Sequence, residues 1–290
     1  MNIFSGLEKF GLKSAESVQL FEDNKKSNQQ HAHQQDDKQQ TKPAEQEIPP
    51  EKDFILEKTV RCKVCDQVFK TKVVKNGRVK RLEPDRDLRP RFQYIDTLKY
   101  DITSCPFCGY TAMNRYFDMI SSGQIKLIRE QIASQFQPKS QSEEESYSYD
   151  TAVDRYKLSL LNTVVKRGRD SEKAFTCLKL SWLLRGKVET MSESTAEEKQ
   201  VKQVCEQEQE EFYQQAFEGF QKAIAGEMFP MCGMEQCTVD YLLACMAFHF
   251  KKYEIASKFL QSVLTSVSAS RRMKDMALEL KDDIIAELRK

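Results

Sequence analysis

The sequence predicts a mostly α-helical protein in which a small β module precedes the helices. Three observations predict this fold class. From residue 111 to the end of the 290-residue chain, apolar residues recur at three- and four-residue steps, which is the period of an α-helix. Residues 53–110 instead show the strand-forming and turn-forming residues of a β module. Residues 24–52 contain too few apolar side chains to form a core, so we expect a disordered linker there.

Composition excludes several classes of protein. Charged residues make up 31% of the chain, and no window approaches the ~20 consecutive apolar residues of a membrane helix, so no membrane span is expected. The first ten residues lack the basic and apolar regions of a secretory signal peptide. Nine cysteines, an odd number, therefore indicate thiols and metal ligands in a reducing compartment, and we predict a cytoplasmic protein.

The N-terminal residues 1–23 hold more apolar side chains than a disordered tail. Ile3, Phe4, Leu7 and Phe10 lie at helical spacing, so these side chains are expected to be buried against something. We predict a short amphipathic recognition segment that binds a partner and is tethered by the Gln-rich linker. The segment could instead dock on the chain's own helical domain or on a membrane surface. The alternative to these three binding modes is a frayed tail whose apolar residues have no role.

The β module is predicted to contain a hairpin. Residues 68–74 and 78–82 flank Asn76-Gly77, a dipeptide that accepts the positive φ angles of a type I′ turn. This turn would place Val74 opposite Val79.

Two Cys-x-x-Cys steps carry the strongest chemical signal in the sequence. Four thiolates presented by two tight turns can converge tetrahedrally on zinc, so we predict one structural Zn²⁺ per chain. A redox motif would need one such step at the start of a helix, and a catalytic zinc would need an open coordination position. Both alternatives fit the sequence less well. The predicted ligands are Cys62, Cys65, Cys105 and Cys108.

The neighbours of these cysteines support the same site. Asp66 and Gly109 follow the second cysteine of each step, where a left-handed backbone conformation is expected. Four thiolates on one Zn²⁺ leave a net charge of about −2, which Arg61 and Lys63 are placed to offset.

Residues 111–290 are predicted to form helix after helix, interrupted by a polar break at 138–146. Asp170-Ser171 and Ser194-Thr195 precede acidic residues and are predicted N-terminal caps. The predicted apolar faces are Ile125, Ile128, Ile132 and Phe136; Val153, Tyr156, Leu160 and Val164; Ala174, Cys177, Ser181 and Leu184; Phe212, Ala216, Phe220 and Ala223; and Met273, Met276, Leu280, Ile284 and Leu288.

A weak internal repeat connects three of the helices. In each, a large residue follows a small one by four positions and precedes a small or branched one by three. Irregularly spaced helical repeats of this kind can stack into a solenoid. The three sets are Ala152, Tyr156 and Ser159; Ala216, Phe220 and Ala223; and Ala256, Leu260 and Val263.

No catalytic constellation emerges, so we predict that the protein is not an enzyme. His249 lies in an apolar run, and Asp85 and Asp87 lie in a charged loop that solvation explains more simply than acid catalysis. The five remaining cysteines are predicted to be small buried hydrophobes, with a metal or thiol role left open for two beside a helix break, Cys232 and Cys237. The other three are Cys177, Cys205 and Cys245.

Basic residues concentrate in the β module, where residues 54–110 carry 13 Lys/Arg and 7 Asp/Glu. A basic hairpin with neighbouring aromatic residues suits phosphate contacts and base stacking, so nucleic-acid binding is the alternative function. The candidate contacts are Lys70, Lys72, Lys75, Arg78, Lys80 and Arg81.

From Phe54 onward the chain resembles the DUF2225 proteins, a bacterial family of unknown function found in Firmicutes and relatives. The resemblance rests on FILEKTVRCKVCDQVFKTK, DRDLRPRFQYIDTLKYDITSCPFCGYTA, YSYDTAVDRYKLSLLNTVVKRG and FPMCGMEQCTVDYLLA. It implies a zinc ribbon followed by tetratricopeptide-like (TPR-like) helices, and no activity. Lys63 and Asp66 depart from the commoner CPxCG form of the first step, but the ligands remain.

Together these observations predict four parts: an amphipathic segment (1–23), a linker (24–52), a zinc-ribbon module (53–110) and a TPR-like α-helical domain (111–290). The predicted function is that of a non-catalytic, zinc-binding scaffold or adaptor that binds a protein or peptide partner through its helices.

Overall fold

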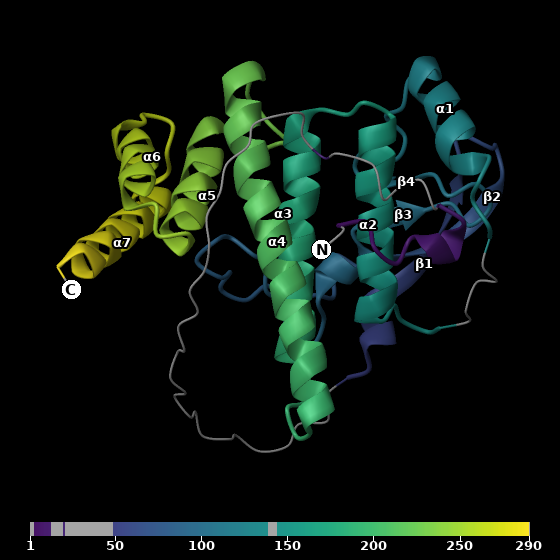
Figure 1. Cartoon of the computed structure of the whole chain (residues 1–290), viewed down its shortest axis with the longest axis horizontal. Helices are drawn as coiled ribbons and strands as arrows, with labels where there is room; N and C mark the ends of the chain where they lie inside the picture. Colours follow the sequence, from purple (N-terminus) through teal and green to yellow (C-terminus); the bar gives the residue numbers. More distant parts are fainter. Residues whose placement is uncertain (1–2, 13–19, 21–48, 139–143, 290) are drawn as a thin grey trace.

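The computed structural model describes residues 3–12, 20, 49–138 and 144–289. The predicted linker falls almost wholly on residues 21–48, which lie outside the described residues. The protein is mostly helical and carries two small antiparallel sheets, which lie together at one end of the row of helices (Figure 1). None of the helices in the described ranges combines the length and the apolar character that a bilayer crossing requires.

The elements follow one another in the order that the sequence predicted, with strands before helices. The strands are β1 (Ile55–Arg61), β2 (Val68–Val74), β3 (Ile102–Ser104) and β4 (Thr111–Met113). The helices are α1 (Ser122–Ile128), α2 (Tyr149–Val165), α3 (Asp170–Glu189), α4 (Ala196–Gly226), α5 (Gln236–His249), α6 (Tyr253–Thr265) and α7 (Arg271–Leu288). Short 3₁₀ turns cover Glu8–Phe10, Glu51–Phe54 and Thr97–Tyr100, and a π-helical turn, Arg129–Ala133, follows α1.

Strand pairing differs from the predicted hairpin. β2 pairs with β1, so that Val74 lies opposite Ile55 and not opposite Val79. Gly77 does not adopt a positive φ angle, and the Arg78 N–H donates to the Lys75 carbonyl at 2.9 Å in an ordinary turn. The first Cys-x-x-Cys step connects β1 to β2, so β2 pairs with the strand before it in the chain and not with residues 78–82 after it. The Asn76-Gly77 hairpin prediction is therefore wrong.

The helices α2 to α7 contact one another in chain order, and α3 and α4 share the most extensive contact (Figure 1). The predicted faces on α3 and α4 are buried throughout, whereas the last stripe frays at Leu288, which is 66% exposed. Thr195 caps α4 as predicted, in a capping box with Glu198. The other predicted cap is wrong, because α3 begins at Asp170 and the Ser171 hydroxyl donates to Glu227.

The N-terminal segment packs against the body of the same chain. Phe4, Leu7 and Leu12 are buried in the main hydrophobic core. The ring of Phe10 stacks on the ring of Phe136 with centroids 5.8 Å apart. The backbone carbonyl of Phe10 also accepts a hydrogen bond from the N–H of Gln137, the residue after Phe136. For residues 3–12, the chain's own domain is therefore the docking surface, in place of the predicted partner. Hydrophobic burial explains this docking, because the apolar side chains of the segment leave water. A surface on the same chain also has a high effective concentration, since the segment is covalently linked to it.

A Leu7→Ala substitution tests this docking. Leu7 is fully buried, and truncating a buried leucine to alanine costs about 2–5 kcal/mol, so we expect the free energy of unfolding to fall by that amount. Urea denaturation followed by circular dichroism measures the change. Leu56→Ala is the matched control, since Leu56 is 43% exposed. Equal stability of the two variants would show that the segment contributes nothing to the core.

Candidate metal centre

Two backbone turns of the same design bring the four predicted cysteines together. The first turn leaves β1 and enters β2, and the second leaves β3 and enters β4. In each, the carbonyl of the first cysteine accepts a hydrogen bond from the N–H four residues later, at 2.9 Å to Asp66 and 3.1 Å to Gly109. The N–H of the first cysteine donates to the carbonyl five residues later. Because the turns repeat each other, each presents its two sulfur atoms to the same point.

The left-handed positions predicted beside the cysteines are confirmed. Asp66 has φ 64° and Gly109 has φ 71°. At Gly109 the surroundings also exclude a side chain, because a Cβ would lie 2.4 Å from Cδ2 of Phe136. Asp66 is exposed, so a side chain fits there, which explains why this turn can do without glycine.

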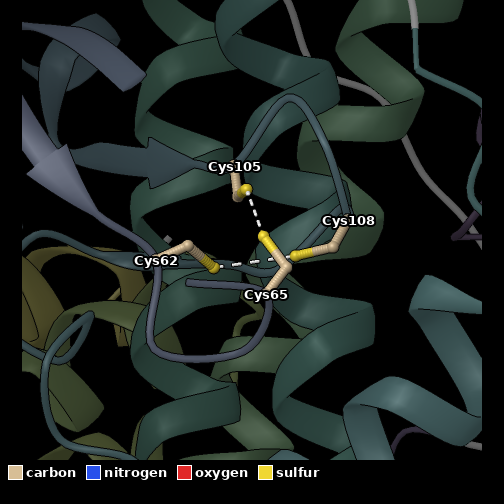
Figure 2. Close-up of side chains that lie close together, drawn as sticks. All are labelled: Cys62, Cys65, Cys105 and Cys108. Carbon is tan, nitrogen blue, oxygen red and sulfur yellow. Dashed lines mark hydrogen bonds between the residues drawn. The ribbon is translucent and has the colours of Figure 1, made fainter. Parts of the chain in front are cut away.

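The four sulfur atoms form a compact cluster (Figure 2). The Sγ atoms of Cys62 and Cys108 are 3.6 Å apart, as are those of Cys65 and Cys105, and all four lie within 4.8 Å of one another. A tetrahedral zinc with Zn–S bonds of about 2.3 Å requires S···S edges of about 3.8 Å. A disulfide, by contrast, requires about 2.05 Å. The spacing therefore fits a shared metal ion and excludes a bonded pair.

Protonation of the cluster also favours a cation. Hydrogen bonds with Cys105 and Cys108 lower the pKa of the Cys62 thiol. Hydrogen bonds with Cys105 and Cys62, together with burial, raise the pKa of Cys108. The first thiolate to form therefore makes the next harder to form. Four thiolates in this space require a positive ion among them, so a dication can displace the thiol protons.

One basic residue near the cluster was missed by the sequence reasoning. Arg129, at the end of α1, donates from Nε and Nη2 to the Val64 carbonyl at 2.8 and 2.6 Å, inside the first Cys-x-x-Cys step. Arg61, predicted to offset the thiolates, instead pairs with Asp66 at 3.1 Å. Lys63 is exposed. Arg129 lies more than sixty residues downstream of the turn it supports, and no local motif marks it.

A comparison with protein-family models matches residues 55–284 to DUF2225, described as an uncharacterized protein conserved in bacteria. The chain belongs to the DUF2225 family. Neither the curated proteins nor the solved structures contain a significant match. The DUF2225 region begins at the first residue of β1 and ends within α7, so it includes both cysteine turns. The docked residues 3–12 lie outside it.

The basic residues proposed for nucleic acid do not share one hairpin in this DUF2225 protein. Lys70 pairs with Glu57 at 2.9 Å, Lys72 lies 5.1 Å from the ring centroid of Tyr147, and Lys75 donates to a backbone carbonyl. The other three lie in the exposed stretch after β2: Arg78, Lys80 and Arg81. Nucleic-acid binding through these residues stays a prediction.

The expected solvated acidic loop is partly buried. Asp87 is 5% exposed and accepts hydrogen bonds from Trp182 Nε1 at 2.9 Å and from Arg185 Nη2 at 2.7 Å. Burial opposes its ionisation, but the bonds and charge of Arg185 lower the pKa of Asp87 overall. The prediction of a solvated Asp87 is therefore wrong, because the loop packs its carboxylate against α3.

Four of the five remaining cysteines are buried, as predicted, and Cys232 is half-buried. Cys232 donates from Sγ to the Ser171 carbonyl at 3.3 Å. In the ranges that the structure describes, no second group of three or more metal-binding side chains accompanies Cys232 and Cys237. His249 Nε2 is hydrogen-bonded to Glu210 Oε2 at 2.8 Å, and the imidazole ring packs edge-on against the ring of Tyr213.

Proposed function

We propose that this DUF2225 protein is a non-catalytic adaptor in which a structural Zn²⁺ joins the two small sheets and the helices bind a protein partner. One observation carries the proposal: four buried or half-buried sulfur atoms lie at the spacing of a tetrahedral thiolate site. Zinc favours such a site. Four protein ligands also complete its shell, which leaves no position for a substrate or a catalytic water.

The adaptor half of the proposal draws on the helices. The nine residues of the three predicted repeats are all buried, and helices α2 to α7 contact one another in chain order. Both features support an irregular TPR-like solenoid, in which each helix packs on its neighbours and leaves a continuous surface for a partner. A partner that binds this surface gives the protein a role without chemistry of its own.

The long helix α4 offers a surface to test. Val201 and Val204 are 57% and 45% exposed and lie three residues apart on one face of the helix. Apolar residues exposed together on a helix are candidates for a partner contact. Val68, on β2, is 54% exposed and provides a matched valine outside the helices.

The experiment is affinity purification of the tagged full chain from its native cell, with zinc measured in the same sample. We expect about one zinc per chain and a stoichiometric protein partner. The Val68→Glu variant should still bind this partner, whereas the double variant Val201→Glu and Val204→Glu should not. Loss with Val68→Glu alone would place the contact on the sheets. Recovery of no stoichiometric partner would contradict the adaptor.

A further inference from the structure

A cavity of about 910 Å³ opens between the β1–β2 pair and α2, elements that lie close together in Figure 1. Its volume is that of a site for a small organic molecule. Side chains from β2 and α2 line the cavity, together with the stacked rings of Phe10 and Phe136. The metal centre does not use this space.

Most carboxylates around the cavity are already neutralised. Glu57 pairs with Lys70 at 2.9 Å, and Glu145 pairs with Lys52 at 3.1 Å. Asp154 pairs with Lys9. The remaining lining carboxylate, Glu144, accepts a hydrogen bond from the Thr151 hydroxyl. Glu144 therefore keeps its charge, and the cavity is also lined by cations outside these ion pairs.

Two of those cations make no salt bridge within the described part of the chain: Lys72 and Arg155. Both lie against the same ring, with Lys72 Nζ 5.1 Å and Arg155 Cζ 4.2 Å from the centroid of Tyr147. Two positive charges therefore lie against one tyrosine, and the carboxylate opposite Lys72 across the strand pair, Glu57, already pairs with Lys70. Burial opposes ionisation of Tyr147, yet the charge of Arg155 lowers the pKa of this phenol overall.

The Arg155 guanidinium is held in place before any ligand arrives. Its Nη2 donates to the Ile102 carbonyl at 2.7 Å and to the Thr71 hydroxyl at 3.3 Å. Its Nε is buried and has no hydrogen-bond acceptor among the described residues. A fixed, planar guanidinium is a group that proteins use to bind carboxylate or phosphate oxygens.

We propose that this cavity binds a small organic oxyanion, with Lys72 and Arg155 contacting the anionic group and the rings of Phe10 and Phe136 contacting an apolar or aromatic body. The proposal is independent of the adaptor function. The oxygens of a phosphate monoester and of a carboxylate satisfy the same donors, so both are sources of the ligand.

The test is a ligand-observed NMR titration of the full-length, zinc-loaded protein with phenyl phosphate, benzoate and inorganic phosphate. We expect phenyl phosphate or benzoate to bind with a dissociation constant of about 1 mM or tighter. Tighter binding of one of the two assigns the ligand class. Inorganic phosphate should bind more weakly than phenyl phosphate, because it lacks a group for the apolar end. Equal binding of these two would overturn the assignment of the phenylalanines.

Variants decide whether the named cations form the site. Lys72→Gln should weaken binding about tenfold, because a charge-assisted hydrogen bond contributes on that order. Arg155→Gln should weaken it at least as much, but it also removes the bond to Ile102 and could disturb folding. Lys72→Gln keeps the test decisive, since Lys72 Nζ lies over the ring of Tyr147 and makes no salt bridge among the described residues. Lys58→Gln is a control of equal charge on exposed β1. Absence of binding at about 10 mM, or equal affinity in Lys72→Gln and Lys58→Gln, would overturn the proposal.

Discussion

A Cys105→Ser variant is expected to retain less than half an equivalent of zinc and to lose the cooperative unfolding of the region around both sheets. The Cys105 sulfur is fully buried and lies 3.6 Å from that of Cys65, so its removal leaves three ligands and an incomplete shell. Structural zinc contributes about 10 kcal/mol or more to folding, which is comparable to the whole stability of a domain. Elemental analysis and thermal unfolding of the purified protein measure both effects.

Cys232→Ser is the control for the zinc measurement. Cys232 is a half-buried cysteine outside the cluster, and a serine hydroxyl can replace its hydrogen bond to the Ser171 carbonyl. Its zinc content should stay at about one equivalent per chain. An unchanged zinc content in Cys105→Ser would falsify the assignment of that ligand.

The second large effect is expected at Arg89, which joins the loop after the β1–β2 pair to α3. Its side chain is only 3% exposed, and its guanidinium binds Glu189 at 2.8 Å and faces Asp85 and Asp96 at 3.6 and 3.7 Å. Gly186 makes room for it, because a Cβ there would lie 2.7 Å from Arg89 Nη2. An Arg89→Met substitution preserves the bulk of the side chain but removes the paired cation of Asp96, whose side chain is 13% exposed, whereas Asp85 and Glu189 keep their bonds to Arg91.

Removing one partner of a buried ion pair costs about 3–5 kcal/mol, so Arg89→Met should lower the free energy of unfolding by that amount at pH 7. Urea denaturation measures it. Arg272→Met is the control, because Arg272 pairs with Glu83 on the surface and its removal should leave the midpoint nearly unchanged. A midpoint in Arg89→Met equal to that of the control would contradict the role of Arg89.

The pH dependence provides a further check on Arg89. In the wild type, the bonds of Arg91 and Arg89 lower the pKa of Glu189 against the effect of burial, so their contribution is present above the unfolded-state pKa and is lost as the pH falls. In Arg89→Met, uncompensated burial raises the pKa of Asp96 further, and the folded state then gains stability as the pH falls. The difference in the free energy of unfolding between the wild type and Arg89→Met should therefore become smaller from pH 7 toward pH 4.

Features that depend on neighbours in the chain were predictable. The two Cys-x-x-Cys steps, the left-handed Asp66 and Gly109 and the capping box at Thr195 each involve contacts over at most five residues. The helical faces were predictable for a similar reason, because the 3.6-residue period determines which side chains share a face. In these cases the residues that interact can be identified without knowing where the rest of the chain lies.

Features that depend on a choice among distant partners were decided only by the tertiary structure. Asn76-Gly77 was a sound turn signal, but β2 pairs with β1 because the cysteine turn already holds the two strands side by side. Three contacts illustrate this: Arg129 with Val64, Arg89 with Glu189, and Phe10 with Phe136. Their residues are separated in the sequence by 65, 100 and 126 positions, respectively. Many segments compete for each such contact, and burial with satisfied hydrogen bonds selects one of them. The sequence by itself therefore determined the four cysteines of the candidate metal site and the helices, whereas the tertiary structure decided what supports these cysteines and where residues 3–12 of the N-terminal segment lie.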